Sequence, residues 1–143
     1  MFTKTKNLND MNKLILSAAL TGAATTRAHC PAIPYTPKEI AEEAKRAVDE
    51  GASIVHIHAR EDNGQPTFRT EVFEQISTEV RALCPDVIIN YSTGAIGMSA
   101  KERVAHLHTT KPDMAAFNMG SMNYAIFSKK DKKFFWNAVF ENS

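Results

Sequence analysis

Two kinds of segment alternate along the hydrophobic and polar pattern of this chain. Apolar runs at residues 14–19, 53–58, 87–91 and 114–117 have the length of β-strands, and the first has the composition of a strand buried on both faces. Between them, apolar residues recur every three or four positions, which predicts amphipathic helices over about 37–50, 70–84 and 100–107. The predicted order therefore alternates four strands with three helices.

Two of the predicted helices begin with a recognisable cap. Thr36 and Ser99 are each followed three positions later by glutamate, the pattern in which two side chains satisfy backbone N–H groups at a helix start. Pro37 suits the first helical position, and Gly51 and Pro85 suit the ends of the first two helices.

The spacing of the strands predicts an α/β fold. Their starts lie 39, 34 and 27 residues apart, the size of repeated β/α units with parallel strands. After residue 120 the pattern changes, because apolar segments at 124–127 and 134–140 flank a charged turn at 128–133. This part predicts a hairpin or an extended loop.

Composition restricts the class of protein. The 143 residues, 43% hydrophobic and 23% charged, fit a single folded domain over 13–143 behind a polar tail at 1–12. A net charge of +1 argues against a nucleic-acid or anionic-membrane partner. No apolar run reaches the ~18 residues of a membrane span, and the start lacks a signal sequence, which favours the cytoplasm. Cys30 and Cys84 are far apart, so packed side chains are the expectation.

The sharpest candidate for chemistry is the pair His56 and His58. On a strand, residues two apart point to the same face, about 6.5–7 Å apart along the chain. The pair lies at the carboxyl end of its predicted strand, where parallel α/β folds place ligand sites. Imidazole is a usual ligand of zinc. The alternative interpretation is a pair of hydrogen-bonded histidines in the core or at its rim.

The other histidines carry weaker signals. His106 and His108 lie at the end of a predicted helix, where residues two apart diverge by about 200°, so we expect them to be exposed and unable to share one ion. His29 lies in a proline-rich loop and is expected at the surface.

Polar loops follow the third and fourth predicted strands. Residues 90–97 and 118–121 are rich in hydroxyl side chains and glycine, which can present hydrogen-bond donors to an anion. The same residues are also ordinary turn chemistry. Because the histidine pair and both loops follow consecutive strands, a single pocket could gather all three.

Several motifs, taken in order, resemble one enzyme family. Residues 14–22, 31–39, 51–61, 92–94 and 111–115 are similar to the β-keto acid cleavage enzymes, typified by the 3-keto-5-aminohexanoate cleavage enzyme of lysine fermentation. The resemblance implies about half of a zinc-dependent TIM (β/α)₈ barrel, in which a β-keto acid and acetyl-CoA exchange acyl groups to give acetoacetate and a new acyl-CoA.

The resemblance also implies roles for individual residues. His56 and His58 would bind zinc, and Ser92, Gly94 and Ala95 would hold the keto acid. The third zinc ligand, a glutamate, and the acid–base residues would lie in a second half of the barrel. Ala24 and Ala116 depart from the amino-acid-specific members, which carry an acidic and a hydroxyl residue there. A substrate ammonium is therefore not expected.

Length leads to a further expectation. A TIM barrel takes about 250 residues, and only four of eight strands can be counted here. We expect an amino-terminal fragment, inactive alone, that associates with a second copy or with a complementing carboxyl-terminal half. The alternatives are a noncatalytic, metal-binding half-barrel that self-associates and a metal hydrolase of the amidohydrolase type. The latter normally has its H-x-H motif after the first strand, whereas here it follows the second.

Overall fold

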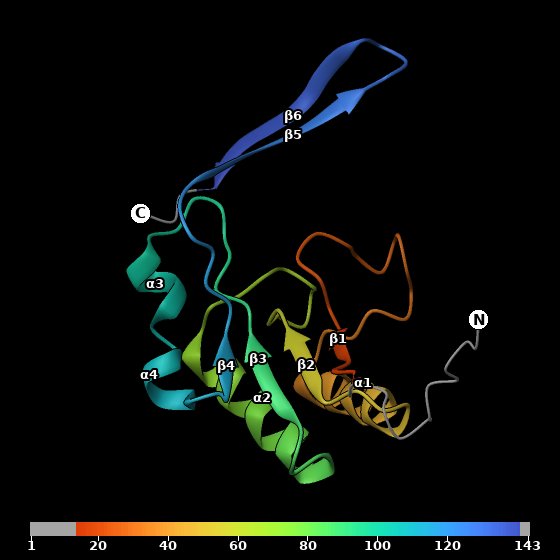
Figure 1. Cartoon of the computed structure of the whole chain (residues 1–143), viewed down its shortest axis with the longest axis vertical. Helices are drawn as coiled ribbons and strands as arrows, with labels where there is room; N and C mark the ends of the chain where they lie inside the picture. The colour runs from red at the N-terminus through yellow and green to blue at the C-terminus, as the bar shows by residue number, and fades with distance from the viewer. Residues whose placement is uncertain (1–13, 141–143) are drawn as a thin grey trace, which may run out of the picture.

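A parallel four-stranded sheet forms the centre of the molecule (Figure 1). The computed structural model describes residues 14–140, and the predicted tail at 1–12 lies outside them. The strands β1 (Ser17–Ala19), β2 (Ile54–Ile57), β3 (Ile88–Tyr91) and β4 (Met114–Ala115) lie side by side in chain order. The predicted α/β fold is confirmed.

Helices connect the strands, as the spacing of apolar residues predicts. The two long ones are α1 (Pro37–Asp49) and α2 (Thr70–Leu83), while α3 (Ala100–Val104) and α4 (Leu107–Thr110) replace the single short helix that was expected. Both predicted capping boxes are present, at Thr36 for α1 and Ser99 for α3. Their side chains satisfy backbone N–H groups that have no partner inside the helix.

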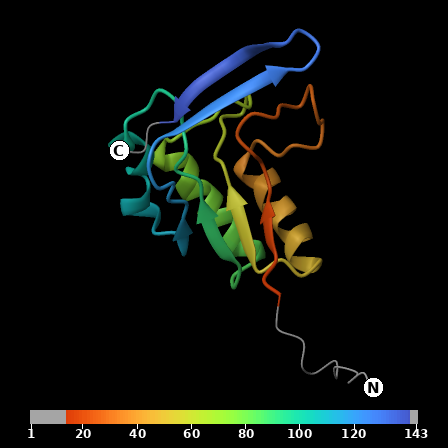
Figure 2. The same cartoon turned by 45° about the horizontal axis from the view of Figure 1, so that its top comes forward.

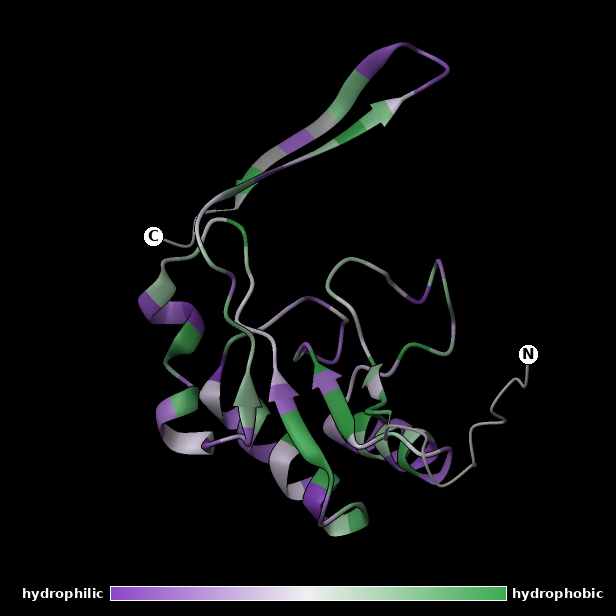
Figure 3. Ribbon diagram, in the orientation of Figure 1, coloured by the Kyte–Doolittle hydropathy of each residue, from purple (hydrophilic) through white to green (hydrophobic). Residues whose placement is uncertain are grey.

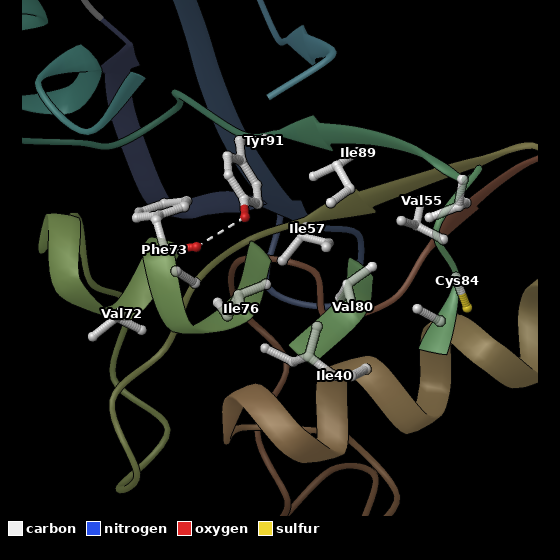
Figure 4. Close-up of a cluster of buried hydrophobic side chains, with 14 residues drawn as sticks. Ile40, Val55, Ile57, Val72, Phe73, Ile76, Val80, Cys84, Ile89 and Tyr91 are labelled. Carbon is white, nitrogen blue, oxygen red and sulfur yellow. Dashed lines mark hydrogen bonds between the residues drawn. The ribbon is translucent and has the colours of Figure 1, made fainter. Parts of the chain in front are cut away.

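The core lies between α1, α2 and one face of the sheet (Figure 4). Val55, Ile57, Ile89 and Tyr91 point toward the helices because alternate residues of a strand face the same side. The helices contribute a row of buried apolar residues to the same layer: Ile40, Ala41, Ala44, Phe73, Ile76 and Val80. In Figure 2 the two long helices lie behind the sheet, so its other face remains uncovered by helices.

The edges of the sheet differ from the expectation of fully buried strands. Leu14, Ile15 and Leu16 are 81%, 70% and 43% exposed, because β1 is an edge strand and begins only at Ser17. At the other edge β4 is short, and Phe117 is 81% exposed. An edge strand has a neighbour on one side only, so the prediction of a first strand buried on both faces is wrong.

The carboxyl-terminal segment forms a hairpin, one of the two forms that the sequence predicts. Strands β5 (Met122–Ser128) and β6 (Lys133–Phe140) pair antiparallel and project away from the sheet (Figure 1). No helix in the described part of the chain is long and apolar enough to cross a membrane.

Candidate metal and substrate site

The two histidines converge at the carboxyl end of β2, as the sequence predicts. Their Nε2 atoms lie 3.3 Å apart, and their ring planes are nearly perpendicular. Both side chains are partly buried on the face of the sheet opposite to the helices, since Val55 and Ile57 occupy the alternate positions. In Figure 3 the hydrophobic strands β2 and β3 become hydrophilic at this end.

Backbone contacts hold the pair in place. His56 lies opposite Asn90 in the register of β2 and β3, and its carbonyl oxygen accepts a hydrogen bond from the N–H of Leu20. The backbone N–H of His58 donates to the Thr21 hydroxyl at 2.8 Å. The loop after β1 and the neighbouring strand therefore position both residues.

The electrostatics of the pair favour neutral imidazoles. Burial lowers the pKa of His56, and the Asn90 side chain opposes this shift. Burial also lowers the pKa of His58 to about 4, and the nearby charges of His56 and Arg60 act in the same direction. A neutral imidazole keeps a nitrogen lone pair for a metal ion, so both rings are in the form that binds metal at neutral pH.

The separation of the two nitrogens fits zinc. Zn–N bonds of about 2.0–2.1 Å at a tetrahedral angle place two ligand nitrogens about 3.3–3.4 Å apart, and the Nε2 atoms are 3.3 Å apart. Within residues 14–140 no group of three His, Cys, Asp or Glu side chains could hold a metal ion. A catalytic zinc normally has three protein ligands, and His56 and His58 are two candidate ligands among the described residues.

The residues of the third loop lie beside the histidines. Ser92 is almost fully buried; its backbone N–H donates to Ile57 O at 2.9 Å, and its hydroxyl oxygen accepts from Gly94 N at 3.3 Å. Ser92, Gly94, Ala95 and His58 line one cavity of about 530 Å³, a volume typical of small-molecule sites. The loops after β2 and β3 thus meet as predicted, whereas the cavity lining does not include residues 118–121.

Sequence reasoning gave no role to Arg60, which is buried in the structure. The side chain is 2% exposed, and its guanidinium donates to the carbonyl oxygens of Gly64 at 2.7 Å and Gly22 at 2.8 Å. It also lies over the Tyr35 ring. A charge two positions after a strand-end histidine was the available signal, but the sequence does not show that backbone carbonyls surround it.

For the other histidines and the two cysteines, the structure confirms some predictions of exposure or burial and corrects others. His29 and His108 are exposed as expected, but His106 is fully buried against the Phe73 ring, so the prediction of exposure is wrong for it. The helix ends before His106 and a new one begins after it, which turns the ring toward the core. Cys84 is buried as expected, whereas Cys30 is exposed.

Comparison with known proteins shows the family of the chain. The sequence model of the beta-keto acid cleavage enzymes matches residues 13–143. The chain belongs to this family. It is 46% identical over 115 residues to the 3-keto-5-aminohexanoate cleavage enzyme of Acetoanaerobium sticklandii, and 49% identical over 117 residues to that of Fusobacterium nucleatum. Each alignment covers 80% of this chain and 42% of the relative.

More distant relatives in the beta-keto acid cleavage family carry other names. The 3,5-dioxohexanoate:acetyl-CoA acetone transferase of Paraburkholderia graminis is 38% identical over 130 residues, covering 87% of this chain and 42% of the relative. Among solved structures, ObcA with oxaloacetate superposes with a TM-score of 0.61 at 23% identity, over 79% of this chain and 27% of that one. That similarity supports the fold: part of a TIM-like barrel. The chain spans less than half the length of these curated relatives.

Proposed function

We propose that this chain provides the metal-binding half of a zinc-dependent β-keto acid cleavage enzyme. The reaction is acyl exchange between a 3-keto acid and acetyl-CoA, giving acetoacetate and a new acyl-CoA. The observation that carries the proposal is the 3.3 Å separation of the His56 and His58 Nε2 atoms beside a cavity that Ser92 also lines. Relatives named as acetyl-CoA transferases support the reaction class.

Different residues of the described part would bind the metal and the keto acid. His56 and His58 would hold zinc, which supplies a Lewis acid toward the 3-keto oxygen when bound. Because the Ser92 hydroxyl oxygen already accepts from Gly94 N, its proton is available to an oxygen of the keto acid. Gly94 and Ala95 shape the wall beside it. The acid–base residues and the third ligand are expected from a second half of the barrel.

Zinc titration tests the metal site. We expect calorimetry of the full 143-residue chain to show one zinc ion bound, and His56→Ala or His58→Ala to weaken its affinity at least ~10-fold, because one remaining imidazole holds the ion poorly. The matched control is His108→Ala, since His108 is exposed on α4. Equal zinc affinity in the unchanged chain and in all three variants would contradict the assignment of His56 and His58 as zinc ligands.

Activity tests the reaction. With zinc and acetyl-CoA, we expect little acyl exchange from the chain alone and a clear gain when the carboxyl-terminal part of a relative is supplied. Absence of exchange in the complemented protein, despite zinc binding at the histidines, would contradict the enzymatic proposal.

A second candidate is a noncatalytic half-barrel that binds metal and self-associates. The observation that favours it is the pair of open sheet edges, at which Ile15 and Phe117 are 70% and 81% exposed. Histidine-dependent zinc binding in a stable dimer, without exchange after complementation, would favour this function. A cytoplasmic location remains a prediction from the sequence.

A further inference from the structure

The turn of the carboxyl-terminal hairpin is strongly basic. Four of the five residues at 129–133 are lysines, and all four are exposed. The fifth is Asp131, whose carboxylate accepts a hydrogen bond from the Ser128 hydroxyl at 2.7 Å. None of the four lysines forms an ion pair with the residues that the structure describes. Four ammonium groups and one carboxylate leave the turn with a formal charge of +3.

The base of the hairpin lies beside the substrate cavity. Val139 of β6 lines a cavity of about 390 Å³ together with residues of the loop after β3. Ala95 and Met98 line both this cavity and the one that contains His58. The two cavities are therefore neighbours, and the hairpin begins at the edge of the site proposed for the keto acid.

The hairpin extends on the side of the sheet where the strands end. Figures 1 and 2 show it beyond the carboxyl ends of the strands, the same side as the histidine pair. Lys133 lies six residues before Val139 in β6, which corresponds to roughly 20 Å along a strand. The hairpin thus leads from the edge of the substrate cavity to the basic turn over about this distance.

Acetyl-CoA has charges and a length that fit this path. Its diphosphate and 3′-phosphate are separated from the reacting acyl group by the pantetheine arm, which has a comparable extended length. Lysine ammonium groups bind phosphate oxygens through charge-assisted hydrogen bonds. Beside Lys133, the rings of Phe134 and Phe135 are 62% and 64% exposed, and an adenine can pack on such a ring.

We propose that the basic turn at 129–133 binds the phosphates of the nucleotide end of acetyl-CoA, while the acyl group lies at the substrate cavity. This inference rests on the proposed function and assigns a second binding region for its co-substrate. The hairpin then serves as a binding arm, with lysines for the phosphates and exposed aromatic rings for the base.

A series of ligands tests the phosphate contacts in the full chain. Calorimetry compares coenzyme A with 3′-dephospho-coenzyme A and with pantetheine. We expect loss of the 3′-phosphate to weaken binding at least ~5-fold and loss of all phosphates at least ~20-fold, because each step removes an anion from the lysines. Added NaCl should weaken the binding of coenzyme A and leave that of pantetheine unchanged, since salt screens exposed charges.

Charge reversal at the turn tests the lysines themselves. Lys129→Glu combined with Lys130→Glu should weaken coenzyme A binding at least ~10-fold, because two contacts are lost and two like charges face the phosphates. Both residues are exposed and lie between β5 and β6, so we expect the circular dichroism spectrum and the zinc affinity to be retained. Lys38→Glu with Lys45→Glu is the matched control, since these exposed lysines of α1 change the net charge equally. It should change the affinity by less than about twofold.

The outcomes distinguish this site from the proposed function. Equal coenzyme A affinity in both double variants, equal affinity for the dephosphorylated ligand, or no binding of coenzyme A by the unchanged chain overturns the hairpin site. Inorganic triphosphate bound as tightly as coenzyme A also overturns it, because the turn would then attract any polyanion. Zinc binding at the histidines and acyl exchange in the complemented protein are measured separately, so the proposed function stands or fails on those results.

Discussion

At the scale of single residues, the His106 ring is buried with no hydrogen bond to either nitrogen from the described residues. The ring is 0% exposed, neither of its nitrogens has a partner among the described residues, and it stacks on Phe73 with 3.7 Å between ring centroids. Burial lowers its pKa to about 4 from 6.5. The side chain therefore packs like an aromatic ring while keeping the desolvation cost of two polar atoms.

Because of this desolvation cost, folding stability should decrease as the pH falls. In the unfolded chain the His106 pKa is the higher one, so the unfolded state gains the proton first as the pH falls from 6.5 toward 4, and folding stability decreases across that window. We expect His106→Phe to remove this part of the acid sensitivity, measured as the free energy of unfolding in urea at several pH values. The exposed control His108→Phe should keep the full decrease.

Arg60 gives a second prediction at this scale. Its guanidinium joins the loop after β1 to the turn after β2 through the carbonyls of Gly22 and Gly64. Arg60→Ala leaves these acceptors unpaired, and we expect it to lower the free energy of unfolding by roughly 3 kcal/mol in urea titration. Arg69→Ala, at an exposed ion pair with Glu61, should change it by less than about 1 kcal/mol. Similar losses in both variants would contradict the buried role.

At the scale of elements, the helix caps tie the loops around the site to the helices. The Thr36 hydroxyl accepts from Glu39 N, and the Glu39 carboxylate accepts from the N–H groups of Tyr35 and Thr36 and from Arg27. The backbone N–H donors of Thr36 and Tyr35 are the main cause that holds the Glu39 pKa at about 2. The start of α1 is thereby fixed to the loop that leaves β1.

Removal of this cap should cost a measurable part of the stability. We expect Thr36→Ala to lower the free energy of unfolding by about 1 kcal/mol in urea titration, because an orphan N–H of the first turn loses its acceptor. Thr25→Ala, an exposed position in the preceding loop, is the control and should have little effect. An equal loss of unfolding free energy in Thr25→Ala would show that the effect comes from the loop and not from the cap of α1.

At the scale of the whole molecule, the sheet has two open edges and one face without a covering helix as far as residues 14–140 are concerned. Leu14, Ile15, Phe117 and Met119 expose 70–83% of their surface near these edges. Unpaired strand edges with apolar neighbours favour association with another chain. The architecture therefore leads to a prediction about self-association.

We expect the purified chain to form dimers or larger assemblies in a concentration-dependent way. Ile15→Lys combined with Phe117→Lys should shift the population toward monomer, because a charge at each edge opposes strand pairing. Sedimentation velocity over a range of concentrations measures this. Replacement of Leu83, an apolar residue 43% exposed at the end of α2, by lysine is the control and should leave the assembly unchanged. A monomer at every concentration would contradict the prediction.

The sequence by itself determined the order of strands and helices, both capping boxes and the shared face of His56 and His58. These features depend on neighbours within a few positions along the chain, and their periods of 2 and 3.6 residues are visible in the pattern. The family motifs could likewise be identified from the residues alone.

Only the tertiary structure decided which side chains are buried and what surrounds them. The sequence predicted that His106 is exposed and gave no role to Arg60, and contacts with distant segments bury both. The same holds for the exposed edge at Leu14 and for the cavity beside His58, which three separate loops build. Burial depends on elements that meet in space, and local periodicity carries no information about which loops face one another.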